Sequence, residues 1–193
     1  MQAVQNAGRR LSRPIGAVLA RAGVSPDLLT ALGLVGNGVA GALLGWGYLF
    51  WGGCVVLVAS ALDMLDGAVA RAGGSATRRG AFLDSVFDRM SEVAAFAGLL
   101  AYSLVRGKTQ EVALIFAAAV GSILVSYMRA RAEGLGIQCK DGVAPREVRV
   151  VILAVGLLAG QLKVALWVLA IVSNLTALHR LVVVARRAGA VKP

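Results

Sequence analysis

The feature that most constrains this chain is a set of acidic side chains inside otherwise apolar sequence. Two long apolar stretches between residues 53 and 104 carry four aspartates: Asp63, Asp66, Asp84 and Asp88. One charge at the centre of a membrane helix costs about 2.5–3.5 kcal/mol on insertion scales. Carboxylates gathered in a low dielectric also repel one another. We therefore expect bound cations to neutralise them, and oxygen ligands favour Mg²⁺ or Mn²⁺ over zinc or copper.

The spacing of the aspartates predicts that they share helix faces. Asp63 and Asp66 are three residues apart, and Asp84 and Asp88 are four apart, so each pair projects from one side of a helix. Small residues occupy positions one helical turn from these acids: Gly67, Ala70 and Gly80. Such positions leave room for a bulky, phosphate-like group between two helices.

Surface acids at two ordinary helix ends, paired with Arg71, Arg78 or Arg89, are the alternative. Asp63 argues against it, because it lies eight residues, or about 12 Å of helix, before the segment end at Arg71. A metal site therefore accounts better for its position.

Composition places the chain in a membrane. The 193 residues are 58% hydrophobic, and the mean hydropathy is +0.76. The net charge of +10 then indicates contact with anionic lipid headgroups, and we expect no nucleic-acid partner. Cys54 and Cys139 provide no disulfide framework, and we expect them not to pair.

Six apolar stretches are long enough to be membrane spans of about 30 Å. They lie at about 28–49, 53–72, 80–104, 110–133, 147–161 and 164–185. The fifth is short, and we expect it to extend at its ends. The fold class predicted is an all-α integral membrane protein, a six-transmembrane-helix bundle over 28–185 within a single domain, 1–193.

Residues 2–22 predict an amphipathic helix lying on the membrane interface. Apolar residues recur every three or four positions, and arginines occupy the other face: Arg9, Arg10, Arg13 and Arg21. A disordered basic tail is the alternative, and Pro14 favours it. The apolar run is too short for a signal peptide.

Basic residues predict the orientation of the spans. They are concentrated before the first stretch, after the second, between the fourth and fifth, and after the sixth. The opposite side has few: Arg106, Lys108 and Lys163. By the positive-inside rule both termini and all four aspartates lie toward the cytoplasm, which in a bacterium means the inner membrane.

Two further groups of residues suit anions. Arg71, Thr77 and Gly80 bracket the loop beside the acidic site, where a guanidinium and a hydroxyl could bind a diphosphate. A second group of basic residues lies at the same ends of three later stretches: Arg129, Arg131, Arg146, Arg149 and Arg180. If the stretches pack as one bundle, these arginines face the cavity of the aspartates and form a second anion site. His179 reads as a polar interface residue rather than a base.

The stretch from Asp63 to Asp88 resembles the signature of the CDP-alcohol phosphatidyltransferases, membrane enzymes of phospholipid synthesis. Eight specified residues match at their spacing: Asp63, Asp66, Gly67, Ala70, Arg71, Gly80, Asp84 and Asp88. The resemblance implies transfer of a phosphatidyl group from CDP-diacylglycerol, or a related CDP-lipid, to an alcohol with release of CMP. It also implies two Mg²⁺ ions, with Mn²⁺ as the alternative, and a homodimer.

The resemblance assigns further roles to residues of this chain. Asp63, Asp66, Asp84 and Asp88 hold the metals, and Asp88 is also the general base. The CDP-lipid is held by the first-span entrance, Asp27, Leu28, Leu29 and Thr30, together with Gly67, Ala70, Arg71, Thr77 and Gly80. From the residues alone, Ser25 and Pro26 are a plausible helix start, with Asp27 complementing the helix dipole.

The arginine group resembles the branch of the family whose acceptor is inositol phosphate. The segment Lys140 to Pro145 departs from that branch, so glycerol 3-phosphate and other alcohols stay open as acceptors. Two non-enzymatic hypotheses also stay open, a divalent-cation transporter and an inactive membrane scaffold. The transporter is disfavoured because the outer halves of the stretches carry no acidic relay.

Overall fold

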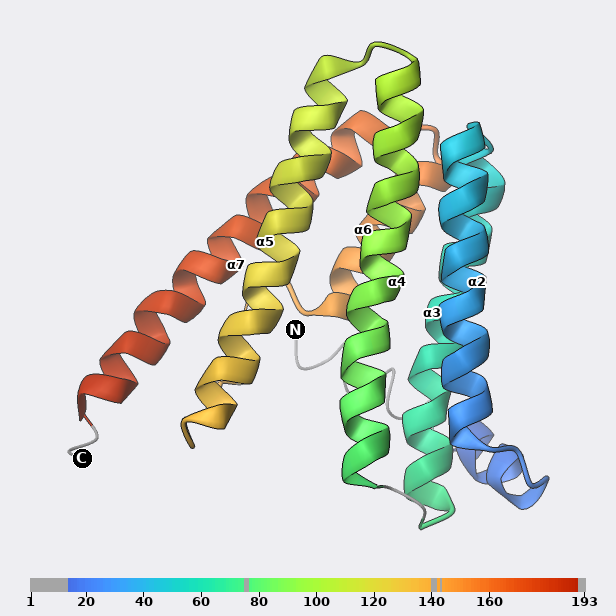
Figure 1. Ribbon diagram of the computed structural model, residues 1–193, viewed down its shortest axis with the longest axis vertical. Helices are drawn as coiled ribbons and strands as arrows, with labels where there is room; N and C mark the ends of the chain where they lie inside the picture. Colours follow the sequence, from blue (N-terminus) through green and yellow to red (C-terminus); the bar gives the residue numbers. More distant parts are fainter. Residues whose placement is uncertain (1–13, 75–76, 140–141, 143, 191–193) are drawn as a thin grey trace. The chain divides into compact units, whose positions relative to one another are not determined.

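A computed structural model describes residues 14–74, 77–139, 142 and 144–190 of the chain. These residues contain helices and no strand, which confirms the all-α prediction. A short helix at 14–21 precedes longer ones (Figure 1). The longer helices are α2 Pro26–Trp46, α3 Leu49–Ala72, α4 Arg78–Val105, α5 Thr109–Gly134, α6 Arg146–Leu158 and α7 Leu162–Ala190.

Within the described part of the chain, four helices are long and apolar enough to cross a membrane, namely α2, α3, α5 and α7. Their outer surfaces are apolar; Trp46 and Phe116, for example, are 72% and 70% exposed. The other two long helices fall short for different reasons. Charged residues fill the first half of α4, and α6 has 13 residues, about 20 Å of helix.

The predicted extension of the fifth stretch is right at its start and wrong at its end. The helix begins at Arg146, just before the predicted stretch, but it ends at Leu158 instead of reaching beyond residue 161. Gly160 follows in the left-handed region, with φ of 67°, and turns the chain into α7. The residues on both sides of this turn are apolar, so the hydropathy pattern does not show that the helix ends here.

The predicted N-terminal helix, 2–22, lies partly outside the described residues. Residues 14–21 are helical, and Ile15 and Val18 are exposed. Gly16 is buried because it lies against α3: a Cβ added there would be 2.7 Å from the Cβ of Ala68.

The start of α2 matches the prediction and its end does not. Ser25 and Pro26 open the helix, and Asp27 lies in its first turn. The expected continuation to residue 49 is wrong, since Gly47 adopts φ of 95° and donates its N–H to the Leu44 carbonyl at 3.0 Å. An αL glycine of this kind is a common end to a helix.

The chain divides into two compact units, residues 1–98 and 99–193, with α4 continuing past the boundary. In the first unit, α2 and α3 pack along each other through small residues. A Cβ on Gly36 would lie 3.0 Å from the Cβ of Ala59, and one on Gly41 would lie 2.5 Å from the carbonyl oxygen of Ala94 in α4. Close approach through small residues is the usual way that helices pack in lipid.

In the second unit, α5 packs against α7, and α6 against the start of α7. Gly121 of α5 leaves room for Asn174, whose Nδ2 donates to the Ala117 carbonyl at 2.9 Å. Hydrogen bonds of this kind tie helices together where water is scarce.

The turn before α5 is held by a buried carboxylate. Glu111 accepts hydrogen bonds from Ser103 at 3.2 Å and from Lys108 at 3.1 Å. The hydrogen bond that Lys108 donates to the Glu111 carboxylate raises the pKa of Lys108 above its ordinary value. Cys54 and Cys139, which the sequence predicted not to pair, are both free thiols.

The glycines of α2 provide a matched test of this packing. Gly41→Ala is expected to destabilise the protein by about 1–3 kcal/mol, because its methyl group overlaps the backbone of α4. Gly38→Ala is the control, since no atom lies within 4 Å of its added Cβ and alanine is the better helix former. Thermal unfolding of the detergent-solubilised protein measures both changes. Equal melting temperatures for the two variants would contradict this account.

Candidate active site

Two aspartates of α3 point toward α2. Asp63 and Asp66 are 8% and 4% exposed, so both carboxylates are buried in an apolar helix. Thr30 of α2 donates its hydroxyl to Asp66 Oδ2 at 2.6 Å, and the Gly67 N–H contacts the other oxygen of the same carboxylate. Helix packing, not solvent, therefore determines how this pair is oriented.

Gly33 makes the position of Asp63 possible. A Cβ added to Gly33 would overlap Asp63 Oδ1, so any larger residue would force this carboxylate to move. Gly33 and Thr30 are three residues apart on α2, on the same face. One face of α2 thus contacts both buried aspartates of α3.

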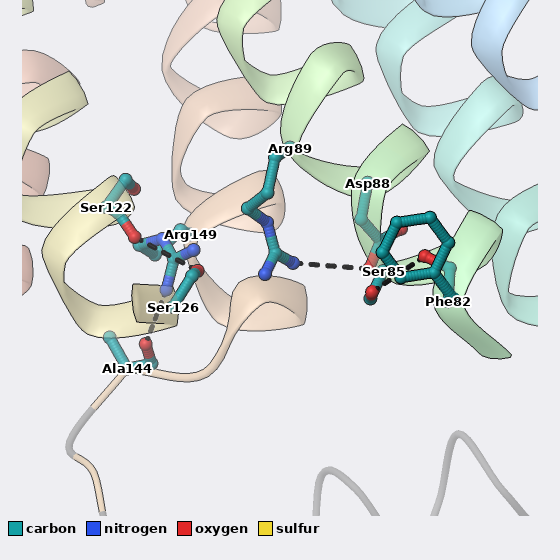
Figure 2. A network of polar contacts seen from close by, with 8 residues as sticks. All are labelled: Phe82, Ser85, Asp88, Arg89, Ser122, Ser126, Ala144 and Arg149. Carbon is teal, nitrogen blue, oxygen red and sulfur yellow. Dashed lines mark hydrogen bonds and ion pairs between the residues drawn. The ribbon is translucent and has the colours of Figure 1, made fainter. Parts of the chain in front are cut away.

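The aspartates of α4 are more accessible. Asp84 and Asp88 are half-buried, and Asp88 forms an ion pair with Arg89 at 3.2 Å (Figure 2). The carboxylates of Asp63 and Asp84 lie within electrostatic range of Asp66. Among the described residues, however, no group of three His, Cys, Asp or Glu side chains is close enough to enclose a metal ion.

The side chains nevertheless have the right chemistry for a hard divalent cation. All four are carboxylates, and Asp63 and Asp66 direct their oxygens to the same face of α2. Mg²⁺ and Mn²⁺ prefer oxygen ligands of this kind, often one or two carboxylates completed by water and phosphate. Asp63 and Asp66 would supply the buried ligands, and Asp84 and Asp88 the accessible ones.

The loop residues predicted to bind a diphosphate have local roles in the structure. Thr77 caps α4, because its hydroxyl oxygen accepts a hydrogen bond from the Gly80 N–H at 3.0 Å. Arg71 is exposed and folds back over Gly67, with Nη1 3.1 Å from an added Cβ. Ala70 lies half-buried on the same helix. Arg71 thus keeps its guanidinium above the end of α3 that carries Asp66.

The first-span entrance divides into an outer and an inner part. Asp27 and Leu28 are exposed, whereas Leu29 is buried and Thr30 is half-buried. Of these residues, Thr30 is the one that the structure joins to an aspartate. The resemblance predicted a role for Thr30 in CDP-lipid binding, and its bond to Asp66 is a contact that sequence reasoning missed.

The arginines of the second unit fall into two groups. Arg149 of α6 and Arg180 of α7 are buried, 3% and 6% exposed. Arg149 donates to the Ala144 carbonyl at 3.0 Å (Figure 2), and Arg180 donates to the Val125 carbonyl of α5 at 2.6 Å. Backbone carbonyls thus fix both guanidiniums.

The other arginines are more accessible. Arg146 is half-buried, and Arg129 and Arg131 are exposed at the end of α5. Arg129 forms an ion pair with Glu133, four residues on, at 2.8 Å. His179 is exposed beside the buried Arg180.

Comparisons with known proteins agree with the geometry. The family model described as CDP-alcohol phosphatidyltransferase matches residues 23–186. The phosphatidylinositol phosphate synthase of Mycobacteroides abscessus is 37% identical over 190 residues, which is 94% of this chain and 86% of that protein.

Solved structures agree as well. The crystal structure of Mycobacterium tuberculosis phosphatidylinositol phosphate synthase with CDP-DAG bound superposes with a TM-score of 0.81 at 36% identity, covering 91% of this chain and 94% of that one. The same enzyme in complex with manganese and citrate gives 0.80 at 36% identity, covering 90% and 88%.

The contact between Gly33 and Asp63 generates a test that needs no enzyme assay. Gly33→Ala is expected to weaken Mn²⁺ binding about 10- to 100-fold, the usual effect of disturbing a group that orients a metal ligand. Titration of the purified protein with Mn²⁺, followed by electron paramagnetic resonance, measures the change. Gly38→Ala, in the same helix with open space around it, should bind Mn²⁺ normally. Unaltered binding in Gly33→Ala would show that Asp63 does not depend on this glycine.

Proposed function

The chain belongs to the CDP-alcohol phosphatidyltransferase family, and from this premise we propose that it transfers a phosphatidyl group from CDP-diacylglycerol to inositol phosphate, releasing CMP. The observation that carries the proposal is the pair of buried carboxylates, Asp63 and Asp66, held against α2 inside the family signature. The members of this family are enzymes, so the transporter and scaffold hypotheses are set aside.

Inositol phosphate is the acceptor that the second unit supports best. Arg149 and Arg180 are two buried guanidiniums, and guanidiniums bind phosphate oxygens in a bidentate manner. With Arg129, Arg131 and Arg146 they supply the positive charge that a phosphorylated acceptor needs. The curated relative and the solved structures are named phosphatidylinositol phosphate synthases.

The aspartates would bind the metal ions beside the donor substrate, CDP-diacylglycerol. Asp63, Asp66 and Asp84 would hold two divalent ions, with Asp88 sharing one, and the bound ions would stabilise charge on the diphosphate. Arg71 from the last turn of α3 and Thr77 from the loop bind the diphosphate, and Gly67, Ala70 and Gly80 leave it space. The first turn of α2, from Asp27 to Thr30, holds the CDP moiety.

Asp88 takes the proton in the chemical step. The acceptor hydroxyl oxygen bonds to the phosphorus of the phosphatidyl group while the bond from that phosphorus to the CMP oxygen breaks. The hydroxyl proton passes to the Asp88 carboxylate, and CMP leaves with the electron pair. Arg89, 3.2 Å away, holds this carboxylate on the accessible side of α4.

The membrane arrangement belongs to the same proposal. We place six crossings of the inner membrane in a single domain, with both termini and the aspartates on the cytoplasmic side and residues 2–22 along the interface. Helices α2, α3, α4, α5 and α7 each make one crossing, and α6, which is about 20 Å long, makes the fifth together with the turn that follows it. One family model covering 23–186 supports the single domain. The chain would act as a homodimer, with lipid contacting the exposed apolar faces.

The orientation can be tested with the two ends of α5. In a cysteine-free chain, Thr109→Cys should react with a membrane-impermeant maleimide in intact spheroplasts, because this exposed position lies at the outer end. Glu133→Cys should react only after lysis. The reverse pattern would invert the topology.

The activity is tested by CMP release from CDP-diacylglycerol with a panel of acceptors. Inositol phosphate should give the largest kcat/KM, followed at a distance by glycerol 3-phosphate and free inositol. EDTA should abolish release, and Mg²⁺ or Mn²⁺ should restore it. A larger kcat/KM with glycerol 3-phosphate would assign the other acceptor, and full turnover in EDTA would remove the metal from the mechanism.

Asp88→Asn tests the base. We expect turnover to fall at least about 10²- to 10⁴-fold, the usual contribution of a positioned general base, while CDP-diacylglycerol binding persists. Glu147→Gln makes the same carboxylate-to-amide change at an exposed residue and should keep full turnover. Substantial residual turnover in Asp88→Asn would exclude this residue as the base.

A further inference from the structure

A buried chain of hydrogen bonds connects α7 to Arg149. The Ala144 N–H donates to Thr176 Oγ1 at 3.2 Å, and the Ala144 carbonyl accepts from Arg149 Nη1 at 3.0 Å. Thr176 in turn donates its hydroxyl to the Val172 carbonyl, one turn earlier in α7, at 2.7 Å. A single residue, Ala144, therefore joins a threonine of one helix to an arginine of another.

Because the residues in these hydrogen bonds are buried, losing one of the bonds is costly. Ala144 and Thr176 are both 0% exposed, and Arg149 is 3% exposed. An N–H group buried at this depth has no water to replace a lost partner, so removing the threonine hydroxyl leaves it unsatisfied. The chain would move to recover a bond, and the Ala144 carbonyl would move with it.

The neighbouring glycine indicates that the same segment also contacts the second buried arginine. A Cβ on Gly142 would lie 2.9 Å from Arg180 Nη2 and 3.3 Å from Thr176 Cγ2. Gly142 and Ala144 thus lie against a corner made by Thr176 and Arg180. Gly142 and Ala144 are therefore packed where both guanidiniums are held.

We infer that Thr176 is a positioning residue for acceptor binding: its hydroxyl holds Ala144, whose carbonyl orients the Arg149 guanidinium toward the acceptor phosphate. The inference rests on the proposed function, which assigns Arg149 to acceptor binding. It adds Thr176, which is not one of the arginines, to the residues on which acceptor binding depends. Thr176 itself touches no reacting atom.

The kinetic test compares three variants of α7. Thr176→Val keeps the shape and removes the hydroxyl, so the KM for inositol phosphate should rise about tenfold while the KM for CDP-diacylglycerol stays unchanged. Thr176→Ser keeps the hydroxyl and should restore the acceptor KM to within about twofold. Ser173→Ala is the matched control, because the Ser173 hydroxyl is fully buried on the same helix and has no hydrogen-bond partner among the described residues.

Two kinetic outcomes would overturn the inference. One is an unchanged acceptor KM in Thr176→Val. The other is an equal loss in Thr176→Ser, because that variant keeps the hydroxyl and the loss could then not be assigned to it.

A second measurement separates this inference from the proposed function. Phenylglyoxal modification of Arg149, followed by mass spectrometry, should be faster in Thr176→Val than in the wild type, Thr176→Ser or Ser173→Ala. This result supports the positioning role even if the wild-type chain uses a different acceptor, in which case only the proposed acceptor fails. Equal modification rates in all four proteins would show that Thr176 does not hold Arg149.

Discussion

The structure depends on how two carboxylates are kept inside an apolar pair of helices. Asp63 and Asp66 would be costly in lipid if each faced hydrocarbon. Instead, α2 approaches closely enough for Thr30 to donate to Asp66 and for Gly33 to leave space for Asp63. The tight packing of α2 on α3 is therefore what makes the acidic signature compatible with a membrane. Binding of a divalent cation would complete the neutralisation.

The buried arginines of the second unit, like the buried aspartates of the first, are hydrogen-bonded to polar groups of the protein, although their charge is positive. Arg149 and Arg180 donate to the backbone carbonyls of Ala144 and Val125. Carbonyl oxygens satisfy some of the five donors of a guanidinium. The two arginines that we propose for acceptor binding are thus held in place before a ligand binds. Fixing a guanidinium in advance lowers the entropy that ligand binding would otherwise lose.

Sequence reasoning succeeded where the signal is local. Hydropathy located the helical segments, and the spacing of the aspartates placed each pair on one helix face, because both patterns depend only on neighbouring positions. Turns were harder, since Gly47 and Gly160 end helices inside continuous apolar sequence. Contacts between segments that are distant in the chain could not be predicted from the sequence. The pairing of Thr30 with Asp66, or of Ala144 with Thr176, depends on how far one helix is displaced along another. The exposed pair Arg129 and Glu133, by contrast, has the i,i+4 spacing that a sequence shows.

The short helix before α2 packs against the part of α3 that carries the aspartate signature. Gly16 rests on Ala68, which is two residues after Asp66 in α3. Ile15 and Val18 are exposed on that helix, as is usual for an apolar face that lies at a headgroup boundary. Any substitution that displaces this helix would therefore be transmitted through Ala68 to the turn of α3 that bears Asp66.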